Sequence, residues 1–371
     1  MQLTTRQAAT ERQHRWKHQG ELSIQGGRTI IEKTGERAER ESRSSGRVRH
    51  LRAINVGNMR VLALADEHER ELLARQLSRQ GWSIRRTSHF LLAWRAKVAE
   101  EPLSVEQLLA HWLSEQESDN RLVDYLQQEL VRDGWLQSEA DFSAVLNALI
   151  VSFEPTAPVR AWRRFALNTF TQLSERIAQG PASIATGSET IAAFATIYRR
   201  LLSLLWGRSL LDVGCACAYW PLLVARGGHC SPESIVAVDR RAEALRLSAL
   251  LAEALGLAAQ LRLEQRDLCQ PAFLRLGQFD TVTAIHLLEH LEESELPLAL
   301  KQLLKVTRRR LLIAVPYEEQ AQACYGHRQV FSPAKLQFWG QWCLAQLEEE
   351  AVYWCEDLCG GLLVIERSQQ P

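Results

Sequence analysis

The C-terminal half of the sequence predicts an α/β fold, in which a mainly parallel sheet carries helices on both faces and ends in an antiparallel hairpin. Short apolar runs alternate with helix-like segments from Ser209 onward, which is the pattern of repeated strand–helix units. The last two apolar runs, 351–356 and 361–367, are joined through a turn that contains Gly360 and Gly361. That arrangement predicts the hairpin.

The same patterns place each element of this half. Gly180-Pro181 marks a boundary, and a helix that begins near Thr186–Thr190 leads to the first strand. Apolar runs predict strands at 210–213, 235–239, 260–265, 279–285 and 310–316. Helical spacing between them predicts helices at 222–225, 242–255, 293–306 and 334–349.

Residues 1–58 form a separate compositional regime. They are rich in Arg, Glu, Gln, Gly and Ser, and they carry too few apolar residues to offset the entropy of ordering, so we expect a disordered leader. The chain has two methionines, Met1 and Met59, and Met59 opens the first segment with a packed pattern. We therefore hypothesise that Met59 is the true start. A genuine basic arm is the rival interpretation.

Residues 59–180 are expected to be a mainly helical domain. Apolar residues at three- and four-residue spacings over 105–113 and 122–131 predict two amphipathic helices. A strand at 61–65, with 82–84 as its partner, allows a winged-helix-like arrangement as the alternative. We favour a helical cap over the active site of the C-terminal domain, which spans 181–371.

Composition narrows the class of partner. Lys plus Arg and Asp plus Glu number 44 each, so no overall positive charge attracts nucleic acid or an anionic membrane. No apolar stretch is long enough to span a bilayer, and the first residues lack the apolar core of a signal peptide. We expect a cytoplasmic protein with a small-molecule or oligosaccharide acceptor and no nucleic-acid partner; the composition does not predict an oligomeric state.

The most informative run is SLLDVGCACAYW, residues 209–220. An apolar strand reaches Asp212, turns at Gly214 and continues into small residues that can begin a helix. The next apolar strand stops at Asp239. This strand–turn–helix–strand layout is typical of sheets that hold a nucleoside-bearing cofactor at the carboxyl ends of their strands.

These residues resemble the S-adenosylmethionine (SAM) site of class I methyltransferases, whose glycine-rich turn reads D-x-G-x-G-x-G. Here Gly214 is retained, and Ala216 and Ala218 replace the second and third glycines. The resemblance implies a Rossmann-like, seven-stranded domain, SAM as cofactor, a ribose contact at Asp239 and an adenine contact at Asp267. Cofactor contacts are expected from Asp212, Gly214, Ala216, Ala218, Asp239, Arg240, Asp267, Leu268 and His286.

Candidate catalytic residues follow the next two strands. The run Leu288–Leu291 reads L-E-H-L, a pattern similar to that of many SAM-dependent methyltransferases, and it places His290 at a strand end. Glu318 and His327 lie in a polar segment after the following strand. A hydroxyl acceptor needs a base, so His290 or His327 is expected to supply it, with Glu318 at the acceptor site. No acidic cluster predicts a metal, although Asp267 and Glu289 leave room for one.

More narrowly, TGSETIAAFATIYRRLL before the first strand and VPYEEQAQACYGHRQVFS after the fifth resemble mycofactocin oligosaccharide methyltransferases. That resemblance implies O-methylation of a hydroxyl on a glycan or a glycosylated cofactor. The alternatives are O- or C-methylation of a quinone or another small molecule, a non-catalytic SAM-fold scaffold, which Ala216 and Ala218 would allow, and nucleic-acid methylation with the leader as an electrostatic arm.

Overall fold

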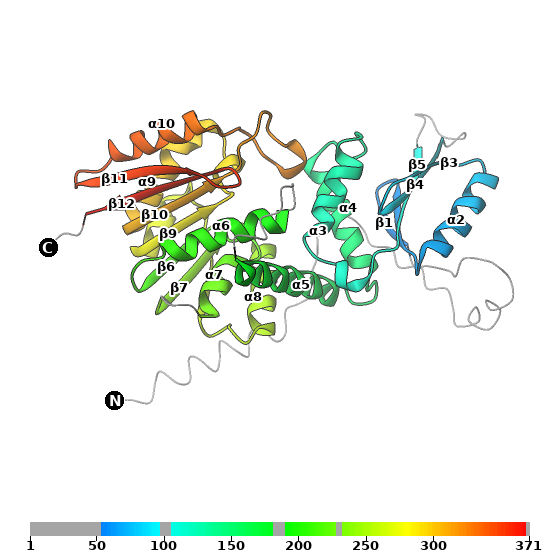
Figure 1. Ribbon diagram of the computed structural model, residues 1–371, viewed down its shortest axis with the longest axis horizontal. Coiled ribbons are helices and arrows are strands. Elements are labelled where there is room, and N and C mark those ends of the chain that lie inside the picture. Colours follow the sequence, from blue (N-terminus) through cyan, green and yellow to red (C-terminus); the bar gives the residue numbers. More distant parts are fainter. Residues whose placement is uncertain (1–52, 97–104, 181–189, 228–231, 369–371) are drawn as a thin grey trace.

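Two sheets lie at opposite ends of the molecule, with helices α3, α4 and α5 between them (Figure 1). The computed structural model describes residues 53–96, 105–180, 190–227 and 232–368. The expected leader lies almost wholly outside these ranges, as does the start of the helix expected at Thr186.

The C-terminal sheet has seven strands in the order β11-β12-β10-β9-β6-β7-β8. The first five along the chain pair in parallel, β12 is antiparallel to β10, and β11 and β12 form the predicted hairpin. Their bounds are β6 Ser209–Val213, β7 Ser234–Asp239, β8 Leu261–Gln265, β9 Phe279–Ile285, β10 Thr307–Val315, β11 Ala351–Asp357 and β12 Gly361–Arg367. The predicted Rossmann-like, seven-stranded fold is confirmed.

Helices cover both faces of this sheet because neighbouring residues of each strand point to opposite sides. Leu210 and Leu211 are both fully buried, but they belong to different cores. One face is covered by α5 Pro158–Gln179, α6 Thr190–Leu204, α7 Tyr219–Ala225 and α8 Ala242–Ala254. The other is covered by α9 Leu296–Val306 and α10 Pro333–Leu344. Both outer layers follow the alternation predicted from the sequence.

The N-terminal part combines helices with a five-stranded sheet of order β1-β2-β5-β4-β3. The strands are β1 Ile54–Val56, β2 Met59–Ala63, β3 Ser83–Arg86, β4 Phe90–Ala96 and β5 Val105–His111. Helix α2 Glu67–Arg79 packs on one face, and α3 Arg121–Leu126 and α4 Glu139–Ser152 pack on the other. No helix in the described ranges has both the length and the apolar character needed to cross a bilayer.

The helix predicted over 105–113 is wrong, because this segment forms β5. Leu109 packs into the core beneath α4, whereas Leu108 and Ala110 pack into the core beneath α2. A strand covered on both faces carries a continuous apolar run instead of an alternating one. Three- and four-residue spacings occur within such a run, so the sequence imitated an amphipathic helix.

Two further expectations for this part are corrected. The predicted strand at 61–65 exists as β2, but it pairs with β1 and β5, whereas the predicted partner, now β3, pairs with β4. Only residues 87–89 separate β3 from β4, so closing the loop between them costs less entropy than pairing β3 with the distant β2. Ile54 is 8% exposed in β1, so packed structure begins before the expected boundary at Met59.

A loop from the C-terminal domain reaches the helices of the N-terminal part. It follows β10, contains the short helix η7 Ala323–Tyr325, and extends toward α3 and α4 (Figure 1). Tyr325 donates a hydrogen bond to Gln127, and its ring meets Phe142 edge-on at 5.3 Å. The start of the loop is held over Gly361, where an added Cβ would lie 2.4 Å from the Tyr317 hydroxyl.

Gly361→Ala tests this support. The new methyl group would also lie 2.5 Å from the Leu336 side chain, so either the loop after β10 or helix α10 must shift. We expect the free energy of unfolding, measured by urea denaturation, to fall by about 1–3 kcal/mol. The control is Val352→Ala on the neighbouring strand, where the residue is 57% exposed and the loss should stay below about 0.5 kcal/mol. Equal losses in the two variants would contradict the contact.

Candidate active site

Five of the candidate site residues lie at one edge of the seven-stranded sheet. Asp212, Asp239 and Asp267 are at or after the ends of β6, β7 and β8, and His286 and Glu318 follow β9 and β10. Because these strands are parallel, their carboxyl ends meet at this edge. The strand order places β6 between β7 and β9, which is the switch point where such sheets bind ligands.

The turn after β6 has the shape of a glycine-rich loop despite its two alanines. Gly214 has φ +74°, and a Cβ there would lie 2.8 Å from the Leu287 side chain, so glycine is required. Ala216 and Ala218 adopt φ +46° and +54°, the left-handed region that L-residues enter at a cost of about 1 kcal/mol each. Both alanines therefore hold a backbone conformation that glycine adopts without this cost.

Asp239 ties this turn to the adjoining strand. One carboxylate oxygen accepts a hydrogen bond from the Ala216 amide at 3.0 Å, and the other accepts from the Arg241 amide at 2.8 Å. Each carboxylate oxygen has two lone pairs, so both retain capacity for the two hydroxyls of a ribose. Asp239 is only 5% exposed, so a ligand can reach its carboxylate only from the solvent side. This arrangement fits the nucleoside of SAM.

Asp212 lies beneath the turn and is 3% exposed. Burial raises the pKa of its carboxyl to about 7, and the nearby Asp239 charge adds to the rise. The Thr283 hydroxyl donates to it at 2.7 Å, which opposes the shift. Asp212 therefore belongs both to the wall of the site and to the hydrogen bonding between β6 and β9.

The remaining cofactor candidates lie along the same edge, in different roles. The Asp267 carboxylate accepts from the Cys269 amide at 2.9 Å and so also stabilises its own turn. Leu268 is buried in the core, Arg240 is exposed, and the Arg240 carbonyl accepts from Gln265. Ala218 is fully buried as the first residue before α7.

A cavity of about 620 Å³ lies between the turn after β6, the β9 and β10 loops and the N-terminal helices. From the candidate set it is lined by Asp212, Gly214, Ala216, His286, His290, Glu318 and His327. Ala218, Asp239, Arg240, Asp267 and Leu268 do not line it. The cavity therefore adjoins the turn after β6 but not the strand ends at Asp239 and Asp267.

Glu289, His290 and His327 come together at this cavity, with one ligand atom from each lying within 4.8 Å of the others. His327 Nδ1 lies 2.9 Å from one Glu318 oxygen and 3.0 Å from the other. His290 Nδ1 lies 3.3 Å from the Gly326 carbonyl oxygen. The three catalytic candidates predicted from the sequence are thus neighbours.

Backbone contacts hold the two loops together. The Arg328 amide donates to the Glu289 carbonyl at 2.8 Å. The Gln329 side chain donates to the Leu288 and Leu291 carbonyls at 3.0 and 2.8 Å. These bonds fix the segment after β10 against the turn after β9, so the positions of His290 and His327 are coupled.

Burial dominates the electrostatics of this group. Together with the Glu318 charge, it raises the pKa of Glu289 to about 8. Burial, with smaller contributions from His327 and His290, lowers the pKa of His286 to about 4. Burial and then His327 also lower the pKa of His290. The imidazoles of His286 and His290 are therefore favoured in their neutral form near pH 7.

The far wall of the cavity comes from the N-terminal helices, which sequence analysis did not assign to the site. Asn120, Asp124, Gln127, Gln128, Arg132 and Thr169 contribute polar side chains there. The Asp124 carboxylate accepts from the Thr190 amide at 3.1 Å, which joins the two parts of the chain. The polar face of the helix predicted over 122–131 was the sequence signal that could have assigned Asp124, Gln127 and Gln128 to the site.

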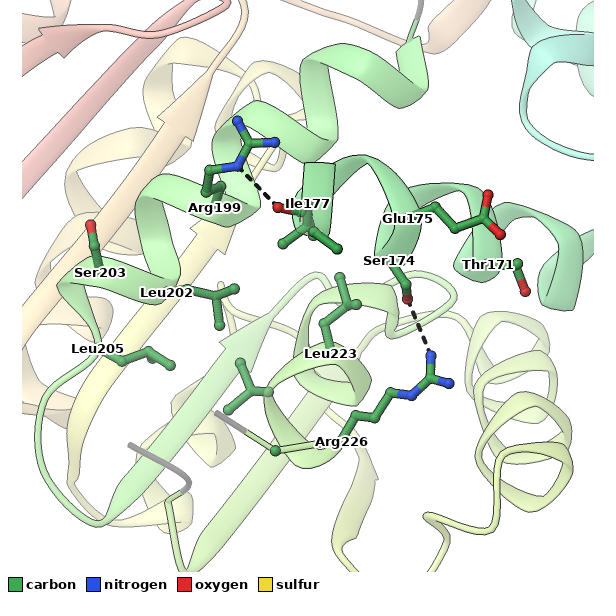
Figure 2. Close-up of a pocket in the computed structure, with 13 residues that line it drawn as sticks. Thr171, Ser174, Glu175, Ile177, Arg199, Leu202, Ser203, Leu205, Leu223 and Arg226 are labelled. Atoms are coloured by element: carbon green, nitrogen blue, oxygen red, sulfur yellow. Dashed lines mark hydrogen bonds between the residues drawn. The ribbon is translucent and has the colours of Figure 1, made fainter. Parts of the chain in front are cut away.

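A second cavity, of about 840 Å³, lies between α5, α6 and α7 (Figure 2). Two arginines on its wall are bound to helix α5: Arg199 donates to the Ile177 carbonyl, and Arg226 donates to Ser174 at 3.3 Å. Its floor includes Leu205, which precedes the amino end of β6. It is therefore remote from the carboxyl edge that carries the candidate residues.

Comparisons with known proteins agree with this location. Residues 210–310 match the family model described as a methyltransferase domain. No curated protein matches the chain in sequence.

Solved structures similar to this chain include three methyltransferases. The methyltransferase domain of bacterial CtHen1 is 20% identical over 47% of this chain and 99% of that chain, with a TM-score of 0.39. Magnesium protoporphyrin IX methyltransferase from Synechocystis PCC 6803 is 15% identical, with coverages of 54% and 95% and a TM-score of 0.37. A putative SAM-dependent methyltransferase from Methanococcus maripaludis is 12% identical, with coverages of 56% and 94% and a TM-score of 0.39.

The match covers the turn after β6, Asp239, Asp267 and the β9 loop, which are the parts of the sheet edge that fit the cofactor. The chain therefore carries a class I methyltransferase domain, and it is a methyl-transferring enzyme whose methyl donor is SAM.

Proposed function

We propose that this enzyme transfers the methyl group of SAM to a hydroxyl oxygen of a glycan or a glycosylated cofactor, of the mycofactocin oligosaccharide type. The observation that supports it most is the Glu318–His327 pair beside His290 on the cavity wall. An imidazole oriented by a carboxylate is the usual means of activating a hydroxyl, whose own pKa is too high for attack at neutral pH.

The cofactor position is proposed from the turn after β6 and the strand ends beside it. The turn lies against the methionine part through Gly214 and Ala216, with Asp212 and His286 at the cavity and Ala218 buried at the end of the turn. Asp239 accepts from the ribose, with Arg240 next to it, and Asp267 and Leu268 contact the adenine. When bound, SAM supplies a methyl group already activated on a sulfonium sulfur. The protein has to position the acceptor in line and exclude water.

Hydroxyl activation is assigned to the histidine pair. Because the Glu318 carboxylate can only accept, His327 donates from Nδ1 and keeps a lone pair on Nε2. Without a bound cation, that lone pair takes the hydroxyl proton directly. His290 is held similarly by the Gly326 carbonyl and forms a polar wall beside the same hydroxyl.

The acceptor class is supported by the chemistry of the opposite wall. Asn120, Gln128, Arg132 and Thr169 are polar residues of the cavity lining, whose larger part is apolar and includes Phe165, Leu173, Phe194, Ile197 and Trp220. Sugar hydroxyls both donate and accept, so these polar residues offer them hydrogen-bond partners, whereas the apolar part of the lining suits a quinone equally well. The cap predicted over 59–180 would then be the part that recognises the acceptor.

His327→Ala is the first test of this assignment. We expect turnover to fall by about 10²- to 10⁴-fold because proton removal is lost, while the dissociation constant for SAM stays nearly unchanged. The assay follows transfer of labelled methyl from SAM to a panel of oligosaccharides and simple glycosides, with a quinol and a catechol as the competing acceptor classes.

The matched control is His89→Ala, which breaks a similar pair outside the cavity, where His89 Nδ1 lies 2.5 Å from Glu129. Its turnover should stay within about threefold of wild type, in line with the small effects of substitutions away from a site. Full activity of His327→Ala would remove the assignment, and methylation of the quinol alone would move the proposal to the small-molecule class.

Ala216→Gly tests whether the turn after β6 is a strained copy of the glycine-rich loop. Glycine relieves the left-handed strain, so we expect the free energy of unfolding to rise by up to about 1 kcal/mol and SAM affinity to be unchanged or tighter. Ala244→Gly within helix α8 is the control, and it should lower the free energy of unfolding by about 0.5–1 kcal/mol. Equal destabilisation of the two variants would contradict the strain.

A further inference from the structure

The Glu289 carboxyl is the least compensated acidic group in the site. Its residue is fully buried, and neither oxygen has a hydrogen-bond partner among the described residues. His286 Nδ1 lies 3.4 Å from one oxygen without forming a hydrogen bond to it. A buried carboxylate normally has a hydrogen-bond donor or a cation beside it, because its desolvation is costly. Glu289 lines the cavity, so a ligand in that cavity can supply the missing partner.

The two histidines near Glu289, His290 and His327, each have one ring nitrogen available to bind a cation. His327 donates from Nδ1 to Glu318, and His290 donates from Nδ1 to the Gly326 carbonyl. Each therefore keeps the lone pair of Nε2. An imidazole that donates one N–H to a carboxylate or a backbone carbonyl while its other nitrogen is free is the usual arrangement of a metal-binding histidine.

We propose that Glu289, His290 and His327 bind one divalent first-row transition-metal ion, and that the ion holds the acceptor hydroxyl. Two imidazoles and one carboxylate with open positions facing a cavity are a donor set suited to Zn²⁺, Mn²⁺, Co²⁺ or Fe²⁺. The sequence predicted no metal because the third ligand comes from a separate loop, which only the fold brings to Glu289 and His290.

The geometry requires only small side-chain adjustments. An ion about 2.1 Å from each of three tetrahedral ligands sets those ligands about 3.4 Å apart. One carboxylate oxygen of Glu289 and one ring nitrogen of each histidine already lie within 4.8 Å of one another. Shortening these separations needs movement of the side chains alone, because the hydrogen bonds from the Arg328 amide and the Gln329 side chain hold the two loops together.

The ion's role in transfer rests on the proposed O-methylation, but its binding does not. With the ion in place, the His327 lone pair is a ligand. A hydroxyl bound to the ion has a lowered pKa, and its proton leaves to water. The hydroxyl oxygen then forms the new C–O bond to the methyl carbon, the S–C bond breaks, and the sulfonium sulfur takes the electron pair and becomes a thioether.

The test is a titration of chelator-treated full-length protein with Mn²⁺, followed by calorimetry and by the electron paramagnetic resonance signal of free Mn²⁺. We expect one equivalent to bind, the melting temperature to rise on binding, and Glu289→Gln to weaken the affinity by at least about tenfold. Glu129→Gln is the matched control: it is another glutamate beside a histidine, outside the cluster, and it should bind Mn²⁺ like wild type.

Glu289→Gln keeps the side-chain size and replaces a buried carboxyl group that has no hydrogen-bond partner among the described residues, so the metal-free variant should be no less stable than metal-free wild type, and a folding failure would be visible in its melting curve. Wild type that binds no Mn²⁺, Co²⁺ or Zn²⁺, or binds them equally well after Glu289→Gln, overturns the metal site. Methyl transfer that persists in chelator but is lost in His327→Ala overturns the ion's role and leaves the proposed O-methylation standing. Transfer restored to the chelated enzyme by Mn²⁺ supports both.

Discussion

The parallel pairing of β6 with both β7 and β9 is the constraint on which the site depends. It sets the carboxyl ends of three strands side by side, and the connections that leave β6 and β9 diverge from there. The turn at Gly214 and the turn that carries Glu289 and His290 therefore face each other. No single segment of the chain contains the site; the sheet assembles it from strand ends.

The second requirement is that the buried polar groups at this edge find partners. Asp239 and Asp212 are bound by backbone amides and by Thr283, so their carboxylates stabilise the turn that they belong to. Glu289 has no such partner among the described residues, although it is fully buried. A group of this kind costs stability unless a ligand compensates it, and such groups are concentrated at functional sites. Asp212 and Asp239 therefore stabilise the turn after β6, whereas the carboxyl group of Glu289 remains available to a ligand.

The C-terminal fold was predictable because each strand–helix unit repeats a local pattern, from the run around Asp212 to the final hairpin. The positions of the candidate residues were predictable wherever they lie at the end of a strand, as Asp239 does, or in the turn after one, as His290 does. The approach of His327 to Glu289 was not, because it depends on a loop closed by Arg328 and Gln329 against a distant turn. Strand β5 was mistaken for a helix because burial on both faces removes the alternation that marks a strand.

The central claim is that the edge at β6 and β7 holds SAM, with Asp239 serving both the turn and the ribose. The most direct measurement is a calorimetric titration of SAM into the wild-type chain and into Asp239→Asn. The account predicts saturable one-to-one binding by wild type and affinity weaker by about tenfold or more in the variant, because a charge-assisted acceptor is lost. Failure of wild type to bind SAM, or equal affinity in the two proteins, would contradict it.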